Sequence, residues 1–110
     1  MHPYYRPRRL REHETIRDLC AETLLDYNKL IMPYFVIEGT HINEPVATMP
    51  GVSRLSIDNL LKTLEADISL GVKSIILFGI PLEKDEKASG AYDDNGIIQR
   101  ACREIKKHFG

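Results

Sequence analysis

The hydrophobic pattern predicts two strands joined by one helix. Residues 30–37 form an apolar run, and we place Pro33 near its start because proline cannot donate to a strand ladder. Residues 74–78 form a second run, with β-branched Ile75 and Ile76 and without polar alternation. Such a run is typical of a strand buried on both faces in a parallel sheet.

Between these strands, apolar residues recur at helical spacing within an arc of about 100°. They are Ile57, Leu60, Leu61, Leu64 and Ile68. Ser56 is a suitable N-cap residue, and Gly71 lies where a C-cap glycine belongs. We therefore expect a one-faced helix that connects the strands in a right-handed β-α-β unit.

Two weaker patterns predict a helix before the first strand and a helix after the second. Residues 15–22 carry apolar residues at helical spacing, with Cys20 on the apolar side and packing as its expected role. Asn95 would cap the last helix. Its expected inner face comprises Ile98, Ala101, Cys102, Ile105 and Phe109.

Two segments show no period and are predicted to be loops. Residues 39–54 contain Pro45, Pro50 and Gly51, and residues 49–52 fit a turn. Residues 82–94 are polar and acidic, and they follow the carboxyl end of the buried strand. This second loop is either a lid or, as a solvated charged loop, a simple connection.

The predicted order places the chain in the α/β class, as a β-α-β-α segment preceded by an extended N-terminal arm. Residues 1–12 form the arm, because they combine prolines and arginines without apolar periodicity. Residues 13–110 comprise an arm helix and two β/α units. Two parallel strands cannot cover both of their own faces, so this pattern resembles the first quarter of a (β/α)8 barrel. We expect the chain to be incomplete on this ground.

Composition and charge exclude some functional classes. The 110 residues carry a net charge of -1, and no apolar run approaches the roughly 20 residues needed to span a bilayer. The N-terminus has no apolar signal region, and Cys20 and Cys102 make no disulfide framework. A cytoplasmic protein without a membrane partner is therefore expected.

The arm concentrates positive charge and aromatic rings. Its candidate interface residues are Tyr4, Tyr5, Arg6, Arg8, Arg9 and Arg11. Arginines interleaved with tyrosines could bind RNA or phosphate, but four charges in an acidic chain make a weak electrostatic footprint. Contact with a neighbouring subunit is the favoured interpretation, and a nucleic-acid-binding arm is the alternative.

Several short motifs occur together in one order and spacing. They are HP at residues 2–3, RPRRLR at 6–11, LIMPYFV at 30–36, MPGV at 49–52, RLSID at 54–58, LFGIP at 77–81, KDEK at 84–87 and AY at 91–92. In this combination the chain resembles the N-terminal portion of porphobilinogen synthase, also called 5-aminolevulinate dehydratase. The resemblance covers essentially the whole chain.

The resemblance implies a homo-oligomeric TIM-barrel lyase, commonly an octamer, whose N-terminal arm wraps a neighbouring subunit. Such an enzyme condenses two molecules of 5-aminolevulinate to porphobilinogen with loss of water, in tetrapyrrole and haem biosynthesis. Zinc, magnesium or both are implied as cofactors of the complete enzyme. The family forms Schiff bases through two lysines, whose amines must be partly neutral to attack a carbonyl.

The lysines and zinc-binding cysteines of the family lie in later strands and loops, beyond Gly110. We therefore assign no catalytic and no metal-binding residue in this stretch, and we expect it to be inactive alone. Phe78 is the candidate for the substrate pocket, because it lies near the carboxyl end of a strand; ordinary barrel packing is the alternative. A non-catalytic assembly module is the other function considered.

Overall fold

A computed structural model describes residues 8–110, and its strands form one four-stranded sheet. The strands are β1 (Met32–Ile37), β2 (Asn43–Pro45), β3 (Ser53–Leu55) and β4 (Ile75–Ile80). Their order across the sheet is β2-β3-β1-β4, with β1 parallel to both β3 and β4 and β2 antiparallel to β3. The predicted parallel pair, connected through a helix, is confirmed.

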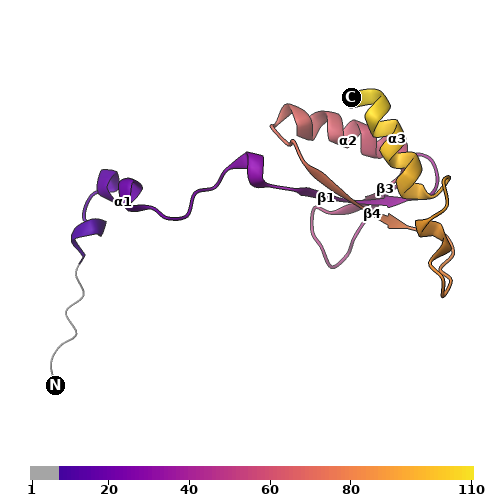
Figure 1. Cartoon of the computed structure of the whole chain (residues 1–110), viewed down its shortest axis with the longest axis horizontal. Coiled ribbons are helices and arrows are strands. Elements are labelled where there is room, and N and C mark those ends of the chain that lie inside the picture. Colours follow the sequence, from indigo (N-terminus) through magenta and orange to yellow (C-terminus); the bar gives the residue numbers. More distant parts are fainter. Residues whose placement is uncertain (1–7) are drawn as a thin grey trace, which may run out of the picture.

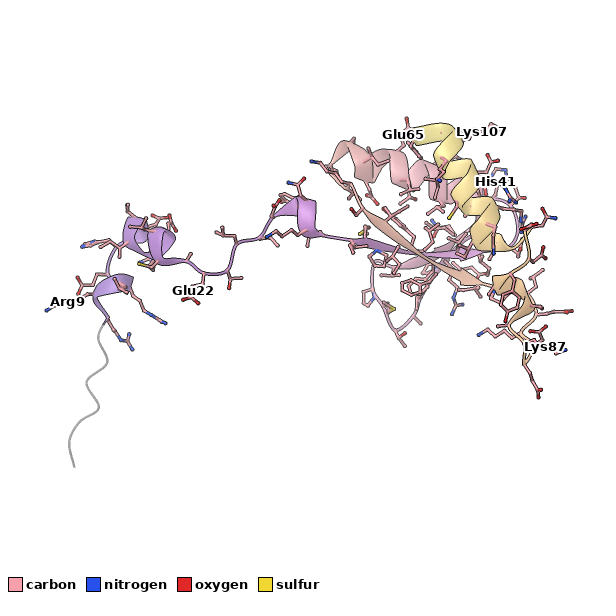
Figure 2. The ribbon with its side chains drawn as sticks, viewed as in Figure 1. Arg9, Glu22, His41, Glu65, Lys87 and Lys107 are labelled. Atoms are coloured by element: carbon pink, nitrogen blue, oxygen red, sulfur yellow. The ribbon has the colours of Figure 1, made fainter. Side chains whose placement is uncertain are left out.

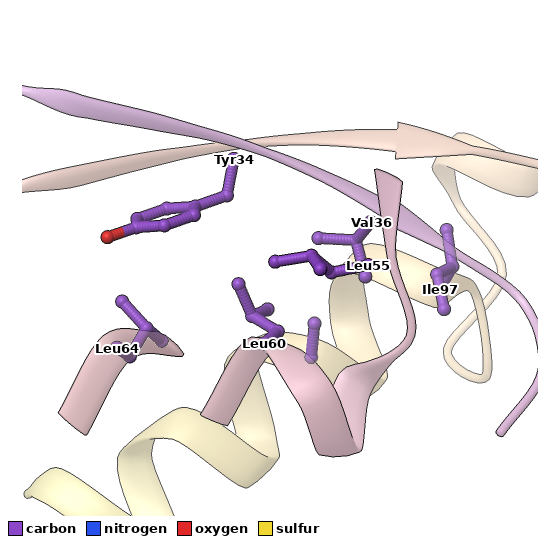
Figure 3. Close-up of a cluster of buried hydrophobic side chains, with 7 residues drawn as sticks. Tyr34, Val36, Leu55, Leu60, Leu64 and Ile97 are labelled. Atoms are coloured by element: carbon purple, nitrogen blue, oxygen red, sulfur yellow. The ribbon is translucent and has the colours of Figure 1, made fainter. Parts of the chain in front are cut away.

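Two helices cover one face of this sheet, as Figure 1 shows. Helix α2 (Ile57–Ser69) precedes β4, and helix α3 (Ile97–Phe109) follows it. The core lies between the helices and the sheet (Figure 3). Its buried residues are Tyr34 and Val36 of β1, Leu55 of β3, Leu60 and Leu64 of α2, and Ile97 and Ala101 of α3.

The arm contains more helical structure than predicted. Arg9–Arg11 form the 3-10 helix η1, so these residues are not extended; residues 1–7 of the predicted arm lie outside the described part of the chain. Helix α1 (Glu14–Cys20) and the 3-10 helix η2 (Tyr27–Lys29) follow. Cys20 is exposed, contrary to its predicted packing role, because α1 packs against η1 and not against the sheet.

Pro33 is accommodated in β1 without the loss of a ladder hydrogen bond. The backbone N–H of Met32 donates to Ser74 on the β4 side, at 2.9 Å. Because successive N–H groups of a strand point to opposite sides, the nitrogen of Pro33 faces the β3 side. β3 pairs only with Phe35 and Val36 of β1, so it offers no carbonyl acceptor opposite Pro33. The missing N–H of Pro33 therefore costs no hydrogen bond between these strands.

The prediction of a plain loop over residues 39–54 was wrong, because β2 lies within it and β3 begins in it. Each strand has three residues, which is too short for a period to appear in the sequence. Their conformation comes from pairing, of β3 with β1 and of β2 with β3. The predicted turn at residues 49–52 is confirmed by the hydrogen bond from Val52 N–H to Met49 O and by Gly51 at φ +81°.

Helix α2 begins and ends close to the predicted residues. Ser56 is its N-cap residue, and Gly71 follows its C-cap Leu70 at φ +106°. The hydroxyl of Ser56 is buried and contacts Asp58 Oδ1 at 2.5 Å, while it accepts from Ile42 N–H at 3.0 Å. The hydrogen bond from Ser56 lowers the pKa of Asp58. Through Ile42, the side chain of Ser56 therefore also fixes the segment that connects β1 and β2.

Three predictions about burial and capping were wrong. Ile76 and Phe78 of β4 are each 45% exposed, because the helices cover only one face of the sheet. Helix α3 has Gly96 as its N-cap residue, where Asn95 was expected. On the predicted inner face of α3, Ala101 is buried and Ile98 and Ile105 pack against the core, as expected, but Cys102 and Phe109 are exposed. Ile97, which was not predicted, is also buried.

Candidate functional site

The candidate site is the edge of the sheet where β1 and β4 end together. Their register runs from Met32 opposite Ile75 to Ile37 opposite Ile80, so both strands finish at the same level. Glu38 and Pro81 are the first residues beyond them. Ligand sites of parallel α/β folds gather at this edge, because the loops that follow parallel strands converge there.

Phe78 lies on the open face of the sheet, away from both helices. It is directly opposite Phe35 in the register, and the two rings stack with centroids 5.6 Å apart. Alternation along the strands places Ile76 on the same face. Phe78 therefore belongs to an apolar aromatic surface near the carboxyl edge. Such a surface is expected both for the wall of a substrate pocket and for ordinary packing inside a closed barrel.

The segment between β4 and α3 is a folded loop that borders an open hollow of about 360 Å³. Lining residues include Gly79 of β4, Lys84 and Asp85 of the loop, and Ile97 and Ile98 of α3. Asp85 accepts hydrogen bonds from the backbone N–H and the hydroxyl of Ser89, and these lower the pKa of its carboxyl group. Figure 2 shows Lys87 projecting from this loop, beyond the end of the sheet.

The arm residues that the structure describes lie far from this edge (Figure 2). Arg8, Arg9 and Arg11 are exposed, and Figure 2 places Arg9 at the opposite end of the molecule from Lys87. The carbonyl of Arg11 accepts a hydrogen bond from Arg17 Nη1 at 3.1 Å. Tyr4, Tyr5 and Arg6 lie outside the described residues. The structure brings none of the described arm residues to Phe78.

The lysines of the chain lack the surroundings that Schiff-base chemistry needs. All seven are exposed; they are Lys29, Lys62, Lys73, Lys84, Lys87, Lys106 and Lys107. A reactive lysine amine is usually desolvated or placed beside another cation, which lowers its pKa. Among the described lysines, burial therefore supplies no activation.

The described residues also do not fit a metal ion. Within residues 8–110, no three His, Cys, Asp or Glu side chains come together as a ligand set. Cys20 and Cys102 are both free thiols. The zinc or magnesium that the family resemblance implies is therefore not matched by a donor set among residues 8–110.

Sequence inspection missed two polar contacts at the elements that build the site. Arg100 of α3 pairs with Glu38, which follows β1. The hydroxyl of Tyr34 in β1 donates to Asp67 of α2 at 2.5 Å. The partners are 62 and 33 residues apart in the chain, so no local signal could have found either pair.

Comparison with known proteins gives a consistent family assignment. The sequence model described as Delta-aminolevulinic acid dehydratase matches residues 4–110. The enzyme of that name from Synechococcus elongatus is 45% identical over 107 residues, covering 97% of this chain and 33% of the relative. The one from Ruminiclostridium josui is 44% identical and aligns with 94% of this chain and 51% of its own length. The chain thus spans about a third to a half of these relatives.

A solved structure supports the same assignment. It is the delta-aminolevulinic acid dehydratase of Toxoplasma gondii in complex with the reaction product porphobilinogen, with a TM-score of 0.81 and 34% sequence identity. The match covers 96% of this chain and 30% of that one, which confirms the predicted α/β fold as a segment of a TIM barrel. Because the family model extends over nearly all of its residues, this chain belongs to the delta-aminolevulinic acid dehydratase family.

Proposed function

We propose that this chain acts as the N-terminal part of a porphobilinogen synthase, which condenses two molecules of 5-aminolevulinate to porphobilinogen with loss of water. The observation that carries the proposal is the family match over residues 4–110. The structural likeness to an enzyme solved with porphobilinogen supports it. In this role the chain supplies one part of the barrel wall, and residues outside this stretch supply the reacting amines.

The proposal includes inactivity of the 110 residues by themselves. All lysines of the chain are exposed, and Phe78 on the open face of the sheet is in contact with solvent. A Schiff base formed on an exposed amine gains no help from desolvation. Incubation of the purified chain with 5-aminolevulinate should therefore yield no porphobilinogen, and clear turnover would refute this part.

The positive test is a chimera. This chain should replace the 107-residue segment of the Synechococcus elongatus enzyme with which it aligns. If the chain performs the proposed role, the chimera forms porphobilinogen at a rate within about tenfold of the parent, a change of ~1.4 kcal/mol in the barrier. A folded but inactive chimera, with the parent active under the same conditions, would favour the non-catalytic assembly module instead.

Phe78 is proposed to line the substrate pocket, and Ile76 provides a matched control. Both residues belong to β4, lie on the open face and are 45% exposed, but Phe78 is two residues nearer the carboxyl edge. In the chimera, Phe78→Ala should raise KM for 5-aminolevulinate about tenfold, equivalent to ~1.4 kcal/mol of binding. Ile76→Ala should leave KM unchanged. Equal effects on KM would instead indicate general barrel packing.

Further features of the complete protein belong to the same proposal. They are an octameric assembly, dependence on zinc or magnesium, a role in haem biosynthesis and a cytoplasmic location. The two free thiols are compatible with a reducing compartment. Within residues 8–110, the helices are too short or too polar to cross a membrane.

A further inference from the structure

The guanidinium of Arg100 bridges the two loops that leave the sheet at the candidate site. Its Nη2 pairs with Glu38, the first residue after β1. Its Nε donates to the carbonyl of Asn95, at 2.9 Å, at the end of the loop that follows β4. The side chains of Arg100 and Glu38 are 40% and 25% exposed, so solvent screens this pair less than a fully exposed one.

Neighbouring side chains of α3 hold the same loop. Gln99 Nε2 donates to the carbonyl of Ala91 at 2.8 Å, and Arg103 Nη2 donates to the carbonyl of Asp94 at 2.7 Å. Of these three side chains, Arg100 is the one that also contacts the end of β1, through Glu38. A planar guanidinium suits this bridging role, because its donors point in fixed directions toward two acceptors.

The loop held in this way forms the wall of the hollow beside β4. Lys84, Asp85 and Ala91 line the hollow from the loop, and Gly79 lines it from the strand. Residues 82–95 of this loop are exposed, and short internal hydrogen bonds such as the one from Ser89 to Asp85 give it local structure. Side chains of α3 donate the hydrogen bonds that join this loop to the helix layer.

We propose that Arg100 is a positioning residue that couples the ends of β1 and β4. Through Glu38 and Asn95 it keeps residues 82–95 folded against the carboxyl edge of the sheet. The coupling itself is a property of this chain. Its consequence for substrate binding rests on the proposed function, in which the same edge faces 5-aminolevulinate.

Hydrogen exchange of the 110-residue chain tests the coupling without any activity. Arg100→Ala should speed amide exchange in residues 82–95 by about tenfold, the effect of losing a hydrogen bond to a charged group. Arg54→Ala is the matched control, because Arg54 also pairs with a glutamate, Glu44, but at 3.9 Å and with both side chains about half exposed. That control should leave exchange in residues 82–95 unchanged.

Two milder variants keep the test decisive if Arg100→Ala unfolds the chain. Glu38→Gln removes one acceptor charge, and Arg100→Lys keeps the positive charge but lacks the planar fork. Both should speed exchange in residues 82–95 to an intermediate extent. The double variant Glu38→Gln with Arg100→Ala should exchange no faster than Arg100→Ala alone. Unchanged exchange in Arg100→Ala, or in both milder variants, would overturn the proposal.

The chimera then tests the consequence for substrate. Arg100→Ala should raise KM for 5-aminolevulinate about tenfold with kcat changed less than threefold, and Arg100→Lys should restore part of the loss. Faster exchange with an unchanged KM would overturn the proposed effect of Arg100 on substrate binding. An inactive parent chimera would count against the proposed function, whereas the exchange measurements would still decide whether Arg100 couples the two loops.

Discussion

At the scale of single residues, Gly79 shows most clearly how closely the helix layer approaches the candidate site. A Cβ atom on Gly79 would lie 2.7 Å from Ile98 Cγ1 and 2.9 Å from Ile97 Cγ2. Both contacts are shorter than real Cβ atoms tolerate, and both partners are branched side chains at the start of α3. Glycine at this position therefore allows α3 to begin directly against the end of β4.

Gly79→Ala should destabilise the chain by about 1–3 kcal/mol, because the added methyl group overpacks this contact. Urea denaturation followed by circular dichroism measures the change in the free energy of unfolding. Gly90→Ala is the control, since a Cβ atom there would meet only Pro81 Cβ at an ordinary 3.9 Å. Equal midpoints for the two variants would contradict the close packing at Gly79.

At the scale of elements, one buried hydroxyl ties the first strand to the crossover helix. Tyr34 is 4% exposed, and its hydroxyl donates to Asp67 of α2. Burial is the main cause that raises the pKa of Tyr34, and the hydrogen bond to Asp67 adds to it. The folded chain therefore favours the protonated phenol more strongly than the unfolded chain does.

This difference makes stability depend on alkaline pH. Below the ordinary tyrosine pKa of 10.0, the phenol is protonated in both states and its contribution to stability is complete. Above it, the unfolded chain loses the proton first. The free energy of unfolding should then fall with increasing pH by up to about 1.4 kcal/mol per pH unit, until Tyr34 itself ionises in the folded chain.

Urea denaturation between pH 8 and pH 11.5 would measure this decline, which Tyr34→Phe should reduce. Tyr92→Phe is the control, because it removes a phenol that is 74% exposed and should leave the decline in place. An identical pH dependence in wild type and Tyr34→Phe would show that the buried phenol is not its source.

At the scale of the whole molecule, the helices cover one face of the sheet while the other face and the arm remain open. Figure 1 shows α1 and η1 extending away from the sheet. Large apolar side chains of the arm and of the segment that follows it are exposed, including Leu10 at 63%, Leu19 at 85% and Leu24 at 79%. Exposed apolar side chains in such number are typical of an interaction site. This pattern supports the proposal that the arm binds a neighbouring subunit.

Deletion of residues 1–11 from the chimera should therefore lower its molar mass in size exclusion with light scattering. The deletion removes the arginine-rich segment and η1, the element against which α1 packs. Phe78→Ala is a suitable control, because it changes the open face of the sheet and leaves the arm intact. An unchanged mass and unchanged activity after the deletion would count against the role of the arm.

Much of the regular structure could be predicted because its signals are local. The helical spacing from Ile57 to Ile68 and the cap residues Ser56 and Gly71 predicted α2, and the apolar runs predicted β1 and β4. The strands β2 and β3 could not be predicted, because a segment of three residues shows no period. Their conformation comes from the pairing of β3 with β1 and of β2 with β3. For the candidate site, position along the chain placed Phe78 near a strand end but could not supply its stacking on Phe35.

The sequence by itself determined the family, the two parallel strands and the crossover helix. The order of the motifs, the hydrophobic period and the cap residues are all properties of residues that are close together in the chain. Only the tertiary structure decided which face of β4 is covered and which distant side chains meet. The contacts Arg100–Glu38 and Tyr34–Asp67 join residues far apart in the chain. Such contacts form when packing brings elements together, so no local pattern of residues encodes them.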